Sequence, residues 1–100
     1  MIVTVFRSRL KPESAEEYAA WAARIEDIAR SMPGYVSHKG FTAPDGERVT
    51  LVEFETEEHV RAWSAQADHV QAKQKGRASF YSEYRIQVCE VLRERAFNSP

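Results

Sequence analysis

Two residues in the second half of the chain have side chains that could act on an aromatic molecule. Trp63 offers a flat ring and an indole N–H that can donate a hydrogen bond. His69 follows six residues later, and an imidazole with an ordinary pKa near neutrality can accept a proton from a phenol. Trp63 can equally be a core residue and His69 a hydrogen-bonded structural histidine, because apolar helix stripes usually pack inside. The sequence leaves both interpretations open.

Three further aromatic residues are expected around the same site. Tyr84 shares one face of a strand with apolar residues that point toward the helices. Phe6 and Phe54 lie on the two strands that are central in the expected sheet. We therefore predict one cavity between the sheet and the second helix, with His69 as the catalytic base. The substrate-binding side chains of this cavity are predicted to be Trp63, Phe54, Phe6 and Tyr84.

The remaining histidines and the single cysteine lack the spacing of metal ligands. His38 lies within a strand and His59 in the first turn of a helix, and we expect both near solvent. The sequence contains no His-x-His, Cys-x-x-Cys or glycine-rich phosphate loop. We therefore predict neither a metal nor any other cofactor.

Composition excludes several classes of partner. The formal net charge of −1 leaves no basic excess for nucleic acid, and the apolar runs are too short to span a membrane. Cys89 is the only cysteine, so no intrachain disulfide can form. The first ten residues also lack the apolar stretch of a signal peptide, which favours a cytoplasmic location. The excess of arginine over lysine indicates a bacterial source.

Local patterns predict two helices. The first begins with a capping box, in which the Ser14 hydroxyl and the Glu17 carboxylate each satisfy a backbone amide. It carries an apolar stripe as far as the Pro-Gly pair that stops it. Thr56 caps the second helix, whose stripe is Val60, Trp63, Ala67 and Val70. We expect this helix to break near Ala67, with Asp68 capping a fresh turn, and to end at Gly76.

Strands at 1–10, 35–42, 48–55 and 80–92 complete the order β-α-β-β-α-β. This order predicts an α+β, ferredoxin-like fold with a four-stranded antiparallel sheet and two helices on one face. Residues 1–92 form the expected domain, and 93–100 a C-terminal tail.

The face of the sheet away from the helices is predicted to mix apolar and charged residues. Its expected members are Val3, Val5, Leu51, Cys89 and Val91, with Arg7, Arg9, Glu53, Glu83 and Arg85. Apolar side chains on an uncovered sheet face make a poor solvent surface, so we predict a homodimer with the sheets packed face to face. The alternative is the opposite strand parity, which would make these residues core.

The whole chain resembles the antibiotic biosynthesis monooxygenases, a family of dimeric α+β barrels. The resemblance lies first in Met32-Pro33-Gly34-Tyr35 and in Val52-Glu53-Phe54-Glu55-Thr56-Glu57-Glu58. It continues in the stretch from Ala62-Trp63 to His69 and in Phe80-Tyr81. It implies a homodimer with a pocket in each subunit. Members of the family oxidise phenols or quinols with O₂ without a cofactor, degrade haem, or bind small signals.

The chain departs from the two best-known residue sets of that family. The haem-degrading type corresponds here to Ser8, Trp63 and Lys73, of which only the tryptophan is retained. The quinol-oxidising type corresponds to Thr50 and Phe54, where an amide and a tryptophan are expected. Three hypotheses follow, in order of preference: a cofactor-independent monooxygenase of small aromatic substrates, a non-catalytic binding or stress-response module, and a haem-binding or haem-degrading enzyme.

Overall fold

The computed structural model describes residues 1–66 and 69–100 in full, and the side chains of Ala67 and Asp68 lie outside the description. The predicted cap at Asp68 therefore lies outside the described residues. Among the described residues, none of the helices has the length and apolar character needed to cross a membrane.

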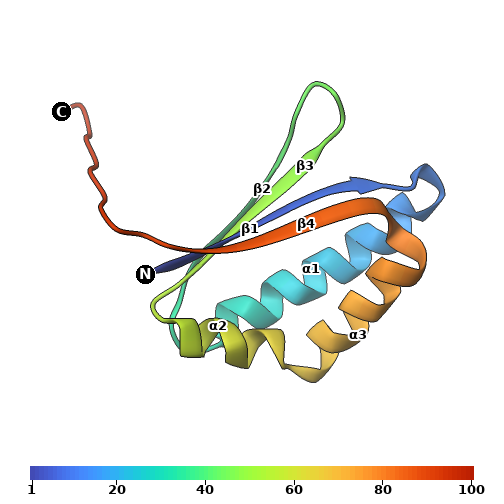
Figure 1. Cartoon of the computed structure of the whole chain (residues 1–100), viewed down its shortest axis with the longest axis horizontal. Helices are drawn as coiled ribbons and strands as arrows, with labels where there is room; N and C mark the ends of the chain where they lie inside the picture. The colour runs from blue at the N-terminus through green and yellow to red at the C-terminus, as the bar shows by residue number, and fades with distance from the viewer.

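Four antiparallel strands form the sheet, in the order β2-β3-β1-β4. They are β1 (Ile2–Leu10), β2 (Tyr35–Thr42), β3 (Arg48–Phe54) and β4 (Tyr81–Glu90). Three α-helices lie together on one side of this sheet (Figure 1). They are α1 (Ala15–Ser31), α2 (Glu57–Ser64) and α3 (Ala67–Lys75). The α+β, ferredoxin-like prediction is confirmed, with the second helix present as two.

The register separates the two faces of the sheet. Thr4 of β1 stands opposite Val52 of β3 and Val88 of β4, and this row faces the helices. Val5, one residue further, stands opposite Leu51 and belongs to the outer face.

The first helix starts differently from the prediction. A 3-10 turn, η1 (Pro12–Ser14), precedes α1 and gives Ser14 a φ of −104° and a ψ of 3° instead of the extended cap conformation. The Ser14 hydroxyl consequently donates to the carbonyl of Ser79 at 2.7 Å and does not cap the helix. The Glu17 carboxylate accepts from Lys75 Nζ at 2.9 Å. The predicted capping box is therefore wrong.

The second helix begins as predicted and breaks. The Thr56 hydroxyl accepts a hydrogen bond from the His59 amide at 3.2 Å, which confirms the cap. The chain leaves α2 after Ser64 and begins α3 at Ala67, which confirms the break. The break also changes the helical phase, so Val70 is 38% exposed instead of continuing the buried stripe. One π turn, η2 (Gly76–Phe80), then leads into β4.

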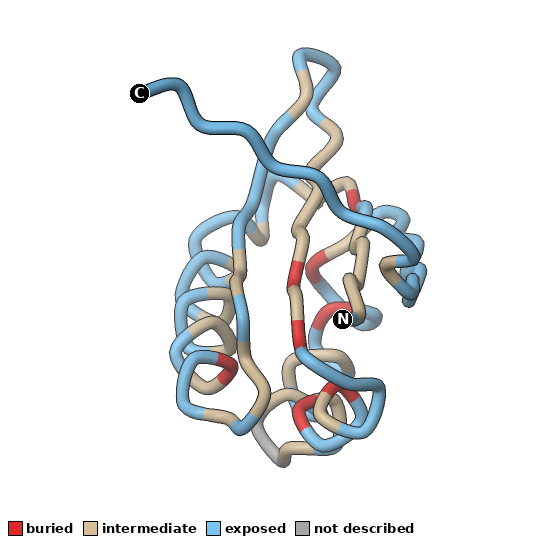
Figure 2. The backbone as a smooth tube through the Cα atoms, turned by 90° about the vertical axis from the view of Figure 1, so that its left-hand side faces the viewer, coloured by how far each residue is buried: buried red, intermediate tan, exposed pale blue. Residues whose placement is uncertain are grey.

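The core lies between the central strands and the helices (Figure 2). Its buried members are Ala29, Val52, Phe54, Val60 and Trp63.

Gly34 lies just before β2, where the chain passes close to α2, and its φ is +81°. A Cβ at this position would overlap the ring of His59 on α2. Only glycine adopts this φ without strain and lacks the Cβ that would overlap His59.

The C-terminal tail is exposed throughout beyond Leu92.

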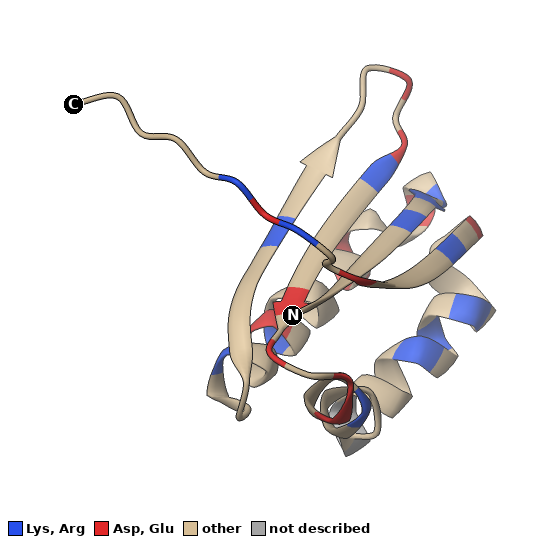
Figure 3. Cartoon of the chain, turned by 60° about the vertical axis from the view of Figure 1, so that its left-hand side comes forward, with Lys and Arg blue, Asp and Glu red and all other residues tan. Residues whose placement is uncertain are grey.

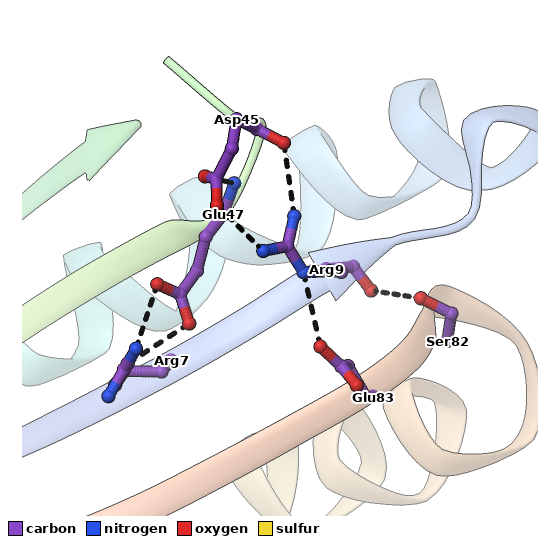
Figure 4. A network of polar contacts seen from close by, with 6 residues as sticks. All are labelled: Arg7, Arg9, Asp45, Glu47, Ser82 and Glu83. Carbon is purple, nitrogen blue, oxygen red and sulfur yellow. Dashed lines mark hydrogen bonds and ion pairs between the residues drawn. The ribbon is translucent and has the colours of Figure 1, made fainter. Parts of the chain in front are cut away.

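Ion pairs on the outer face tie the turn between β2 and β3 to β1 and β4 (Figure 4). Arg7 makes two 3.0 Å hydrogen bonds to Glu47, and Arg9 contacts Asp45 at 2.9 Å and Glu83 at 3.1 Å. The Arg7 guanidinium lowers the pKa of Glu47. Because these pairs are exposed, they fix the position of the turn more than they stabilise the fold.

Candidate functional site

A cavity of about 310 Å³ lies between the inner face of the sheet and the helices. Its floor comes mainly from β1, β3 and β4, and its other walls from all three α-helices and from η2. The lining is mainly apolar and aromatic, and the size is that of sites that bind small molecules. The break between α2 and α3 lies beside it, since Ser64 and His69 both contribute to the lining.

Trp63 and His69 form one wall of the cavity. Their ring centroids are 4.3 Å apart with the planes inclined at 48°. Nδ1 of His69 lies 3.2 Å from the carbonyl oxygen of Trp63. A carbonyl only accepts, so Nδ1 donates and carries the proton, and Nε2 is left as the acceptor. The contact crosses the break in the helix, because Trp63 lies on α2 and His69 on α3.

The imidazole of His69 is neutral at physiological pH. Burial lowers its pKa to about 4, the hydrogen bond to Trp63 opposes this shift, and Lys73 adds to it. A neutral imidazole can accept a proton without first losing one. Its low pKa also means that it holds an accepted proton weakly unless an anion lies beside it.

A second aromatic group lines the end of the cavity near β4. The Phe6 ring lies 5.7 Å from that of Tyr84 and 5.3 Å from that of Tyr81. The ring centroid of Tyr81 also lies 5.8 Å from that of Tyr18 of α1. Burial, followed by the neighbouring Tyr18, raises the pKa of Tyr81, so it stays protonated. Tyr84 itself is 42% exposed, which places it at the open edge of the sheet.

Four of the five residues predicted for the site line this cavity: Phe6, Trp63, His69 and Tyr84. Phe54 does not. It is fully buried behind Trp63, with the two ring centroids 5.4 Å apart. Its position supports the orientation of the indole.

His38 contributes to the site, although the sequence indicated a solvated residue. Its side chain is 14% exposed, lines the cavity, and lies 3.7 Å from Glu26 of α1. Burial lowers its pKa, against the opposing effect of Glu26. The pairing of β2 with β3 explains this position, because His38 stands opposite Val52 and therefore shares its face; the sequence alone does not give that pairing.

Two residues that line the cavity each have a buried polar atom without a hydrogen-bond partner among the described residues. These atoms are Nε1 of Trp63 and Oγ1 of Thr4. An unpartnered buried polar group typically costs about 1–3 kcal/mol. Surrounding protein atoms cover the indole N–H, so it is a buried donor without a partner and does not open onto the cavity. In the described part of the chain, no three histidine, cysteine or acidic residues gather as metal ligands.

Comparison with known proteins agrees with the architecture. A relative from Bacillus subtilis (strain 168), YqjZ, is 29% identical over 93 residues, which are 93% of this chain and 82% of that protein. The structure of Rv0793 from Mycobacterium tuberculosis matches with a TM-score of 0.84 and 14% identity, covering 95% of this chain and 98% of that one. A mutant of SnoaB, a cofactor-independent oxygenase from Streptomyces nogalater, matches with a TM-score of 0.79 and 18% identity over 93% of this chain and 94% of that one.

The family model for antibiotic biosynthesis monooxygenases matches residues 1–75. This span contains all of β1 to α3 and most of the walls of the cavity. The chain belongs to the antibiotic biosynthesis monooxygenase family.

Proposed function

We propose that this protein is a cofactor-independent monooxygenase that oxidises a small phenol- or quinol-type aromatic molecule with O₂. The observation that carries the proposal is an apolar cavity with a neutral imidazole on one wall, beside the ring of Trp63. Membership of the family and the shared fold of SnoaB, a cofactor-independent oxygenase, support it.

The substrate supplies the electrons in this reaction. Anthrone is a suitable probe, because its central methylene carbon loses two hydrogens and gains one oxygen atom, giving anthraquinone and water from one O₂. His69 takes the first proton, so the resulting carbanion can transfer an electron to O₂. The apolar walls exclude water from the intermediates.

Oxygen uptake with anthrone tests the proposal. We expect the wild type to accelerate uptake and to form anthraquinone, and His69→Asn to lose most of that rate. His59→Asn is the matched control, because His59 lies on α2 against Gly34 and outside the cavity lining. Unchanged rates in His69→Asn would remove the imidazole from the mechanism.

A non-catalytic binding module is the second candidate. The observation in its favour is the pKa of about 4 for His69, which makes the imidazole a weak base. Binding of aromatic molecules without oxygen uptake or product would select this function.

We also infer that two copies pack through the outer faces of their sheets. Val5 and Leu51 lie side by side at the centre of that face, and no helix covers them (Figure 1). Arg85 stands opposite Arg7, and no ion pair joins Arg85 to a carboxylate in the described part of the chain. A second copy would cover the apolar residues and bring an acidic side chain such as Glu53 toward Arg85.

A further inference from the structure

One wall of the cavity carries a row of nitrogen-containing side chains. His69, Lys73 and Arg77 follow one another at intervals of four residues, and all three line the cavity. Residues four apart lie on the same face of a helix. The sequence has no aspartate or glutamate from residue 69 to residue 82. Figure 3 accordingly shows basic segments and no acidic ones along the described part of α3.

The two cations of this row have no counter-ion among the described residues. Nζ of Lys73 donates to Oγ of Ser64 at 2.6 Å, and no described carboxylate lies within ion-pair distance of Lys73 or Arg77. Two nearby cations that do not line the cavity each pair with a carboxylate. Arg61 pairs with Glu57 and Lys75 with Glu17, each at 2.9 Å. The cations that face the cavity thus differ from these neighbours in having no paired carboxylate in the part of the chain that the structure describes.

The electrostatics favour an anion at this end of the cavity. Burial, and then the nearby Arg77, lowers the pKa of Lys73, so the ammonium is held at an energetic cost. Like charges at helical spacing destabilise each other, and an anion between them removes that cost. The described lining of the cavity contains no acidic residue that would oppose it.

We propose that the cavity recognises an aromatic ligand through an anionic oxygen, that of a carboxylate, held between Lys73 and Arg77 while the ring lies against Trp63. The proposal deepens the proposed function and rests on the cavity being its ligand site. It specifies that the ligand is negatively charged, which the apolar walls alone do not indicate.

Calorimetric titration with 2-naphthoate and 2-naphthamide tests this, because the two probes share a ring system and differ in charge. We expect the wild type to bind naphthoate about tenfold more tightly at low salt, as a charge-assisted contact worth about 1.4 kcal/mol would give. High salt should reduce this preference. Un-ionised 2-naphthol should resemble the amide and so separate a carboxylate from a neutral phenol.

Substitutions at Lys73 test whether this side chain causes the preference for naphthoate. Lys73→Gln should remove most of the preference for naphthoate and leave the affinity for naphthamide within about twofold, whereas Lys73→Arg should restore the preference. Arg61→Gln removes the same charge outside the cavity and should bind both probes as the wild type does. Circular dichroism of Lys73→Gln checks that it is folded, and Lys73→Arg gives the comparison if it is not.

The outcomes separate this proposal from the proposed function. Equal affinities for naphthoate and naphthamide, or a Lys73→Gln effect of the same size on both, would overturn the anion site. A preference for naphthoate that depends on Lys73 supports it even if anthrone is never oxidised. Turnover of uncharged anthrone without any preference for naphthoate would uphold the monooxygenase and overturn the anion site.

Discussion

Nδ1 of His69 donates a hydrogen bond to the carbonyl oxygen of Trp63 across the break between α2 and α3. The same arrangement brings the imidazole to 4.3 Å from the indole. An uninterrupted helix would carry the two residues in different directions, since six residues correspond to about one and two-thirds turns. The break thus creates the pairing on which the candidate site depends.

The burial of His69 predicts a pH dependence of stability. The pKa is about 4 in the folded protein and 6.5 in the unfolded reference, so the unfolded chain binds the proton more readily. The stability associated with His69 is therefore complete above pH 6.5 and is lost as the pH falls toward 4. The loss is on the order of 3 kcal/mol at most.

Urea unfolding of the wild type and His69→Asn from neutral pH down to pH 4 measures this effect. The stability of the wild type relative to the variant should fall across that range, because only the wild type has this titrating group. His38, whose pKa is also lowered by burial, contributes equally to both proteins. Parallel pH profiles would show that His69 is not buried in its neutral form.

The two glycines with positive φ should respond differently to substitution. Gly34→Ala should cost about 2–4 kcal/mol, because it combines the left-handed backbone penalty with overlap against His59. Gly46→Ala, with a φ of +91° and open space around it, should cost only the backbone penalty of about 1–2 kcal/mol. Chemical denaturation measures both values. A cost for Gly34→Ala no larger than that for Gly46→Ala would contradict the close approach of β2 and α2.

The outer face of the sheet predicts self-association. Light scattering at micromolar concentration should give twice the chain mass of 11.5 kDa for the wild type. Val5→Lys, which places a charge at the centre of that face, should give the mass of one chain with an unchanged circular dichroism spectrum. Val70→Lys is the control, because Val70 is exposed on the opposite, helical layer. A clean monomer for the wild type would refute the dimer.

Much of the framework could be predicted from local patterns. The strand 35–42 matches β2, and both the cap at Thr56 and the break in the second helix follow from adjacent residues. The wrong capping box has a tertiary cause: Ser79, which accepts the Ser14 hydroxyl, is far away in the sequence. Alternation correctly placed Tyr84 on the helical face, where it lines the cavity.

The polar part of the site was harder to predict. Placing His38 required the pairing of β2 with β3, because alternation alone does not say which face of an edge strand is covered. From the sequence, Lys73 was considered only as the counterpart of a residue in the haem-degrading type and Arg77 was not singled out, and the fold shows that both line the cavity. Phe54 was assigned to the right region, but the size of Trp63 separates it from the cavity.

Oxygen uptake by a protein with a filled cavity tests the central claim most directly. Ala72→Leu adds volume to the lining on α3, and Ala23→Leu makes the same change at an exposed position on α1. With anthrone as the substrate, we predict that Ala72→Leu keeps the wild-type melting temperature or exceeds it while losing about tenfold or more of the uptake rate. Ala23→Leu should retain the rate. Wild-type uptake by a folded Ala72→Leu protein, or no uptake by any of the three proteins, would contradict oxidation of an aromatic substrate in this cavity.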